Sequence, residues 1–203
     1  LFQQAVSRAQ VASGSHVSPV TTLIVTNEEH RFLALDQLRE LSGTKATLLL
    51  EPSGRNTAPA LTLAALCALE QGDDPILLIT PADQTIQNQP AFENAIQTAL
   101  QIAQTGAIAI LGITPSAPET GYGYIKTKNV IPAQPGIHTL QVKAFVEKPD
   151  AATAQQYLDE GGYFWNAGIF VLKASVWLKA LQRFRPDIHQ ATLQAWTQRS
   201  SDA

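Results

Sequence analysis

The 203-residue sequence has no methionine and a single cysteine, Cys67. One cysteine excludes a disulfide framework and a metal cluster built on sulfur. Its place in the apolar run at 64–69 predicts a buried small side chain rather than a reactive thiol. Because even an initiator methionine is missing, we expect the chain to begin inside a longer protein.

Basic residues and long apolar runs are also scarce. The 14 Lys and Arg are outnumbered by 17 Asp and Glu, which gives a formal net charge of −3 at pH 7. Without a block of basic residues, the chain lacks the phosphate-neutralising surface of a nucleic-acid binder. No apolar run approaches the ~18 to 20 residues of a membrane span, and residues 1–4 do not resemble a signal peptide. We therefore expect a cytoplasmic protein that binds a small molecule or a nucleotide. We expect neither nucleic acid nor a membrane as a partner, and the sequence allows a homo-oligomer.

Strand-like and helix-like segments alternate along the first half of the chain. Short apolar or β-branched runs predict strands at 21–26, 47–50, 75–80 and 107–113. Apolar residues at helical spacing, with closing glycines, predict helices at 28–41, 57–71 and 90–105. Continuous apolar strands separated by helices are typical of a parallel sheet covered on both faces. This order predicts an α/β fold with a mostly parallel sheet flanked by helices.

The pattern changes after Pro115. Strand-like runs at 123–127 and 141–146 are followed by a predicted helix at 151–160 and a strand at 163–173. The segment 175–196 is helical in pattern, with a break at Pro186. We expect one domain that carries an antiparallel appendage.

The segment Glu-Pro-Ser-Gly-Arg-Asn-Thr-Ala-Pro-Ala at 51–60 directly follows the second predicted strand and opens the next helix. Ligands of open α/β sheets lie at such strand ends, beside helix N-termini. The carboxylate of Glu51 only accepts hydrogen bonds, so it could take two N–H donors from the guanine edge, which adenine does not offer. The alternative is a capped turn in which Glu51 interacts with Arg55.

Asp83 follows the third predicted strand. An aspartate there is a candidate ligand for Mg²⁺, which commonly uses one or two carboxylates together with substrate phosphates. An Asx-turn or a helix N-cap explains Asp83 equally well. The neighbouring acidic pair at 73–74 is interpreted as a solvated turn.

Two later segments carry further candidate groups. Tyr122 lies between two glycines, a pattern that allows close backbone approach to a ligand but also fits a β-bulge or hairpin turn. Glu147 could accept hydrogen bonds from sugar hydroxyls and Lys148 could contact a phosphate, although such a pair is commonly a solvated ion pair. Asn166 offers a donor and an acceptor to a polyol.

Five motifs in this order resemble the mannose-1-phosphate guanylyltransferases (GDP-mannose pyrophosphorylases) of the sugar nucleotidyltransferase family. They are Glu-Pro-Ser-Gly-Arg-Asn-Thr-Ala-Pro-Ala at 51–60, Pro-Ala-Asp at 81–83, Glu-Thr-Gly-Tyr-Gly-Tyr-Ile at 119–125, Phe-Val-Glu-Lys-Pro at 145–149 and Trp-Asn-Ala-Gly-Ile-Phe at 165–170. The ten-residue segment is the most specific of the five.

The resemblance implies a Rossmann-like nucleotide-diphospho-sugar transferase fold that joins GTP and mannose 1-phosphate into GDP-mannose and pyrophosphate with Mg²⁺. Matched motif by motif, it implies that Asp83 holds the metal and that Lys148 contacts the sugar phosphate, both as catalytic residues. The implied nucleotide-binding residues are Glu51, Pro52, Gly54, Arg55, Asn56 and Thr57. The implied sugar-binding residues are Tyr122, Gly123, Glu147 and Asn166.

The chain departs from the family pattern at both ends. The glycine-rich signature Gly-Gly-x-Gly-Thr-Arg, which binds the triphosphate, and a later Asp-Val-Gly segment with a second metal carboxylate are both absent. We therefore interpret 1–203 as a nucleotidyltransferase domain truncated at both ends, and expect weak nucleotide binding and little turnover.

Two other functions remain open. One is a sugar-1-phosphate nucleotidyltransferase that uses a different sugar or base; the other is a regulator that binds sugar nucleotides without chemistry. A dinucleotide-dependent dehydrogenase is disfavoured, because no Gly-x-Gly-x-x-Gly follows a predicted strand.

Overall fold

The computed structural model describes residues 1–12, 20–41, 43–70, 72–128 and 138–201. The chain folds into two compact units. The first consists of Leu1–Ala109 and Phe170–Ala203, and the second of Ile110–Ile169. Among the described residues, no helix has the length and apolar character needed to cross a membrane.

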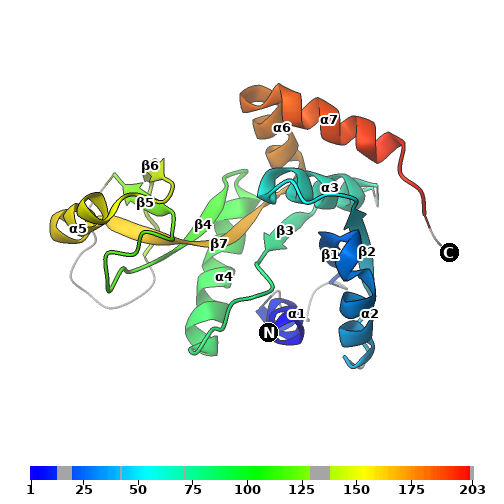
Figure 1. Ribbon diagram of the computed structural model, residues 1–203, viewed down its shortest axis with the longest axis horizontal. Helices are drawn as coiled ribbons and strands as arrows, with labels where there is room; N and C mark the ends of the chain where they lie inside the picture. Colours follow the sequence, from blue (N-terminus) through cyan, green and yellow to red (C-terminus); the bar gives the residue numbers. More distant parts are fainter. Residues whose placement is uncertain (13–19, 42, 71, 129–137, 202–203) are drawn as a thin grey trace. The chain divides into compact units, whose positions relative to one another are not determined.

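The first unit combines helices with short strands (Figure 1). Its elements are α1 (Phe2–Ala12), β1 (Thr22–Asn27), η1 (Glu28–His30), α2 (Arg31–Arg39), β2 (Ala46–Glu51), α3 (Thr57–Leu69), β3 (Ile76–Ile79), α4 (Gln89–Gln104), α6 (Ala174–Phe184) and α7 (Pro186–Thr197). Strands β1 and β2 pair in parallel, and their last residues, Asn27 and Glu51, lie side by side. Strand β3 pairs antiparallel with Phe170–Lys173.

Helices α3, α6 and α7 pack against one another. Helix α3 is apolar on nearly every side and buries Leu61, Thr62 and Ala65. The fully buried Thr62 hydroxyl donates to Ala58 O (2.7 Å) and accepts from Trp177 Nε1 (2.9 Å), so no polar group of this pair is left without a partner.

The second unit is built on antiparallel strands. Its elements are β4 (Ala109–Ile113, whose first residue belongs to the first unit), β5 (Tyr124–Thr127), β6 (Val142–Val146), α5 (Ala151–Glu160) and the first part of β7 (Tyr163–Lys173). Strand β5 lies between β6 and β7, and β4 also pairs with β7. The buried residues Tyr124, Ala154 and Tyr163 form a core against which Tyr157 packs.

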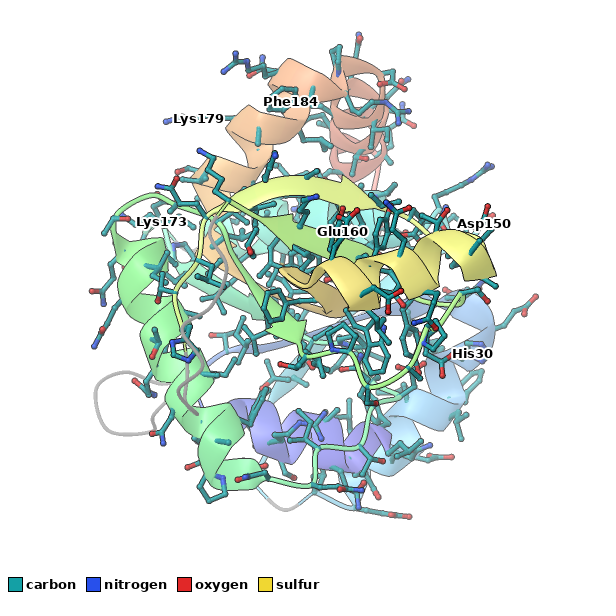
Figure 2. All side chains as sticks on the ribbon, turned by 90° about the vertical axis from the view of Figure 1, so that its left-hand side faces the viewer. His30, Asp150, Glu160, Lys173, Lys179 and Phe184 are labelled. Carbon is teal, nitrogen blue, oxygen red and sulfur yellow. The ribbon has the colours of Figure 1, made fainter. Side chains whose placement is uncertain are left out.

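Helix α5 is capped at its start by Asp150, whose carboxylate accepts from the Thr153 N–H (2.8 Å). Figure 2 shows Asp150 and Glu160 at the two ends of this helix. Near its other end, Lys126 Nζ donates to Tyr163 Oη (2.8 Å) and lies 3.4 Å from a Glu160 oxygen. These bonds raise the pKa of Lys126.

The α/β class and the antiparallel appendage are confirmed. Three details differ from the sequence expectation. Helix α1 was not predicted, β3 runs antiparallel to its partner β7, and the predicted helix at 28–41 is divided into η1 and α2. Residue 71, the last of the helix predicted at 57–71, lies outside the described residues.

The acidic pair at 73–74 is more than a solvated turn. Although Asp74 is exposed, its two carboxylate oxygens accept from the Ser175 N–H (2.9 Å) and hydroxyl (2.7 Å), at the start of α6. These two hydrogen bonds hold the pKa of Asp74 below its ordinary value.

Candidate functional site

Glu51 ends strand β2, directly before the loop that leads into α3. It is partly buried, and desolvation raises the pKa of its carboxyl. Within the described part of the chain, its carboxylate makes no hydrogen bond or ion pair, so the alternative of a Glu51–Arg55 pair is not formed. A partly desolvated carboxylate with free acceptor sites is suited to a ligand that brings hydrogen-bond donors.

The loop after Glu51 has an unusual backbone at Asn56, where φ is 65° and ψ is −170°. That region is adopted almost only by glycine. Asn56 occupies the N-cap position of α3, yet its side chain makes no capping bond. Pro52, Gly54, Arg55 and Thr57 are exposed, and a Cβ added at Gly54 would meet no atom within 4 Å. The first helical N–H groups of α3 and these exposed side chains are thus available to a ligand with an anionic group.

Asp83 lies in the segment between β3 and α4, and it is exposed. The N-cap of α4 is Asn88, whose Oδ1 accepts from the Ala91 N–H (3.1 Å), so the N-cap alternative for Asp83 is not formed. The next residue, Gln84, accepts through its carbonyl from Arg8 Nη2 (3.3 Å), which ties the segment to α1. Among the described residues, no three His, Cys, Asp or Glu side chains gather as a metal cluster. Asp83 therefore offers one carboxylate, which suits Mg²⁺ only if phosphates and water complete its shell.

In the second unit, Gly123, Glu147 and Asn166 lie together. The Asn166 N–H donates to Gly123 O (2.8 Å), and Asn166 Oδ1 accepts from the Gly168 N–H (3.0 Å). A Cβ added at Gly123 would lie 2.9 Å from Glu147 Oε2 and 3.0 Å from the Phe145 ring. The Glu147 carboxylate and the Phe145 ring thus lie close against the backbone of Gly123. The Asn166 amide nitrogen and the exposed Glu147 carboxylate are left to offer donors and acceptors.

Tyr122 and Lys148 flank this group. The Tyr122 ring meets the Trp165 ring edge-on, with centroids 5.3 Å apart. The indole N–H of Trp165 is buried and has no hydrogen-bond partner in the described part of the chain. Lys148 has a positive φ of 45°, and its Nζ lies 3.8 Å from Glu147 Oε1 in an exposed pair. Trp165 lies in the motif at 165–170, where the sequence indicated a binding role only for its neighbour Asn166.

The predicted residues thus divide between the two units. The first unit holds Glu51, Pro52, Gly54, Arg55, Asn56, Thr57 and Asp83, and the second holds Tyr122, Gly123, Glu147, Lys148 and Asn166. The first group combines a desolvated carboxylate, a helix N-terminus and a free aspartate. The second combines an aromatic pair, a carboxylate, an amide and an amine.

Comparisons with known proteins identify the family of the chain. The family model described as nucleotidyl transferase matches residues 4–203. The xanthan biosynthesis protein XanB of Xanthomonas campestris pv. campestris (strain B100) is 48% identical over 181 residues, which are 89% of this chain and 38% of that protein. A mannose-1-phosphate guanylyltransferase of Escherichia coli is 49% identical over 170 residues, which are 83% of this chain and 36% of that enzyme.

A solved structure shares the fold. The crystal structure described as mannose-6-phosphate isomerase from Helicobacter pylori aligns with a TM-score of 0.82 and 34% identity, over 97% of this chain and 70% of that chain. The chain spans a little over a third of the length of the two curated relatives. The chain belongs to the nucleotidyl transferase family.

Proposed function

We propose that this chain is part of a nucleotidyltransferase that transfers GMP from GTP to α-D-mannose 1-phosphate, giving GDP-mannose and pyrophosphate. The relatives support this proposal, because one of them is named for that reaction and another for a mannose phosphate. The activity belongs to the protein that contains the chain, since the chain covers 36% of the named guanylyltransferase.

The observation that carries the proposal is the unpartnered, partly desolvated carboxylate of Glu51 at the end of β2. Guanine presents two adjacent N–H donors on its Watson–Crick edge, and a carboxylate accepts both in parallel. Adenine offers no such pair of donors, so Glu51 would select the base. The loop at 52–57 would then face the ribose and the base, with Arg55 and Asn56 as polar contacts.

The second unit supplies the chemistry for the sugar. Glu147 would accept from mannose hydroxyls, the Asn166 amide would donate, and the Tyr122 ring would form an apolar wall. Lys148 would place its ammonium against the sugar phosphate. Its distance of 3.8 Å from Glu147 leaves its hydrogen-bond donors available.

The transfer itself requires no protein nucleophile. An oxygen of the mannose phosphate attacks the α-phosphorus of GTP in line, and the bond between that phosphorus and the pyrophosphate oxygen breaks. The protein contributes by holding the two substrates in line and by placing Lys148 beside the phosphate charge. Asp83 would hold Mg²⁺, which when bound neutralises charge on the phosphates.

Glu51→Gln tests the assignment of the base. The amide replaces one acceptor with a donor, so one N–H of guanine loses its partner. We expect the ratio of GTP to UTP affinity to fall about 10- to 100-fold, as for loss of a hydrogen bond to a charged group. Equilibrium titration of both nucleotides measures the ratio.

Glu40→Gln is the matched control, because Glu40 is exposed and its only described contact is a bond from Gln3 that an amide oxygen also accepts. An unchanged ratio in Glu51→Gln would favour a sugar-1-phosphate nucleotidyltransferase with another base. Binding of GDP-mannose without turnover by the longer protein would favour a sugar-nucleotide-binding regulator.

A further inference from the structure

Asn27 ends strand β1 beside the carboxylate to which the proposed function assigns the base. The parallel register of β1 and β2 (Figure 1) pairs Asn27 with Glu51, the last residue of β2. Neighbouring strands lie about 4.8 Å apart, and paired residues direct their side chains to the same face of a sheet. Both residues are partly buried at the carboxyl end of the strand pair, where ligands of α/β sheets bind. Asn27 therefore borders a ligand that Glu51 holds.

One hydrogen bond fixes the orientation of the Asn27 amide. Its Oδ1 accepts from the Glu29 N–H (3.1 Å) at the start of the short helix η1. Because a backbone N–H only donates, the oxygen must face Glu29, and Nδ2 must face the other way. In the described part of the chain, Nδ2 makes no hydrogen bond, and neither does the Glu51 carboxylate. Two neighbouring residues thus offer a ligand one N–H donor group and two acceptor oxygens.

The Watson–Crick edge of guanine carries three polar groups in a row, which are the O6 acceptor, N1–H and the N2 amine. A carboxylate at Glu51 accepts from N1–H and from the N2 amine, but it offers nothing to O6. An acceptor that loses water and finds no donor weakens binding. The free amide nitrogen of Asn27 is the donor that this edge still requires.

We propose that Asn27 is a base-specificity residue of the nucleotide site, whose Nδ2 donates to guanine O6 while Glu51 accepts from N1–H and the N2 amine. The register then sets the direction of the base, because O6 must lie on the β1 side of Glu51. Adenine carries an amine in place of O6, so two donors would face each other at Asn27. The role of Asn27 rests on the proposed function, since it requires guanine at Glu51.

Calorimetric titration of the chain with GTP and with 6-thio-GTP isolates the contact to O6. The analogue replaces this oxygen by sulfur, a weak acceptor, and keeps N1–H and the N2 amine. We expect wild type to bind GTP about 3- to 10-fold more tightly than the analogue, as for one hydrogen bond. In Asn27→Ser this ratio should fall to about 1, because serine still caps η1 but is too short to reach O6. In Glu51→Gln the ratio should stay as in wild type, since both nucleotides lose the same contact.

Asn88→Ser is the matched control. Asn88 is an exposed asparagine of the same unit, and its Oδ1 also caps a helix by accepting from a backbone N–H, that of Ala91 (3.1 Å). Asn88→Ser should leave both affinities unchanged. If Asn27→Ser kept the wild-type ratio of GTP to 6-thio-GTP affinity, with or without a common loss, Asn27 would only cap η1 and the proposal would be overturned. Equal binding of the two nucleotides by wild type would also overturn it.

Failure of the proposed function gives a different result. An unchanged ratio of GTP to UTP affinity in Glu51→Gln would remove guanine from Glu51, and the role of Asn27 with it. A lowered ratio there, together with a wild-type ratio of GTP to 6-thio-GTP affinity in Asn27→Ser, would overturn the role of Asn27 alone. If Asn27→Ser does not fold, Asn27→Asp decides, because it keeps the cap and the shape but replaces Nδ2 by an acceptor. Its ratio of GTP to 6-thio-GTP affinity should be about 1 or lower, and a wild-type ratio would overturn the proposal.

Discussion

Asn56 and Lys148 are the non-glycine residues of the described chain that have a positive φ. Each lies in one of the two groups of candidate site residues. Backbone strain of this kind costs of order 1 to 3 kcal/mol and persists only where surrounding structure enforces it. Because Asn56 makes no capping bond, its side chain does not compensate for the strain. We infer that its geometry is retained for the ligand.

Asn56→Gly should therefore have opposite effects on stability and on binding. Glycine adopts this backbone freely, but it also gains entropy in the unfolded chain. We expect the free energy of unfolding to rise by up to about 1 kcal/mol, while GTP affinity falls because the amide is lost. Urea denaturation and nucleotide titration measure the two quantities.

Asn88→Gly is the control for Asn56→Gly. Asn88 has an ordinary φ of −106° and caps α4 through its side chain, so glycine should lower stability there by a few tenths to about 1 kcal/mol. A loss of stability in both variants would show that Asn56 is not strained.

The buried hydroxyl of Thr62 is a second residue whose removal has a calculable cost. Thr62→Val keeps the shape of the side chain but leaves Trp177 Nε1 without its acceptor. We expect a loss of about 1 to 3 kcal/mol in the free energy of unfolding by urea. Thr98→Val, which removes a comparable i−4 bond to Asn94 O on α4, should change it by less than about 0.5 kcal/mol.

At the scale of elements, the start of α6 depends on a side chain about a hundred residues earlier. Asp74 accepts from the N–H and the hydroxyl of Ser175, which is the role of an N-cap, although Lys173 holds that position in sequence. Asp74→Ala should destabilise the chain by about 1 kcal/mol at pH 7, as for loss of a capping side chain.

The stability that the Asp74 side chain contributes depends on pH. The pKa of Asp74 is lower in the folded chain than its ordinary value of about 3.9. The contribution is therefore complete above about pH 4 to 5, and it is lost as the pH falls through the folded pKa. Denaturation of wild type and Asp74→Ala at several pH values measures it. Asp73→Ala is the control in the same turn, because Asp73 makes no hydrogen bond in the described chain. If the difference in free energy of unfolding between wild type and Asp74→Ala grew on acidification, it would contradict the capping role.

Elements with strong local signals were predictable from the sequence. Strand β7 and helix α5 have the predicted bounds, because a long aromatic and β-branched run and a capping aspartate define them. Helix α2 was predicted from apolar residues at helical spacing within 28–41. One of those apolar residues, Phe32, is nevertheless 74% exposed, whereas Ala34 is buried. Helical spacing alone does not show which stripe of a short helix is covered.

For the candidate site, the sequence predicted which residue types lie at the ends of strands, but not how those residues pair. The free carboxylates of Glu51 and Asp83 depend on which side chains fail to pair, and a sequence does not state this. The backbone of Asn56 gave no signal either, because asparagine is also a common helix cap. The burial of Arg8 against α4 and the Gln84 carbonyl also had no signal in the sequence, because these contacts join residues more than 70 positions apart.

At the scale of the whole molecule, the chain divides into two compact units that share strand β7. Local unfolding follows such units when their internal contacts dominate. Thr62→Val weakens the first unit, and Gly112→Ala weakens the second, because a Cβ at Gly112 would lie 2.9 Å from Phe164 Cβ. Overpacking of this kind costs about 1 to 3 kcal/mol.

Hydrogen exchange read by mass spectrometry should separate the two effects. In Thr62→Val, peptides from 57–69 and 174–197 should exchange faster, while exchange in peptides from 138–169 is unchanged. In Gly112→Ala, peptides from 138–169 should exchange faster, while exchange in peptides from 57–69 and 174–197 is unchanged. The shared strand predicts one exception, peptides from β7, which should respond to both substitutions because β7 pairs with β3 at one end and with β5 at the other. Equal acceleration throughout the chain in both variants would show a single cooperative unit instead.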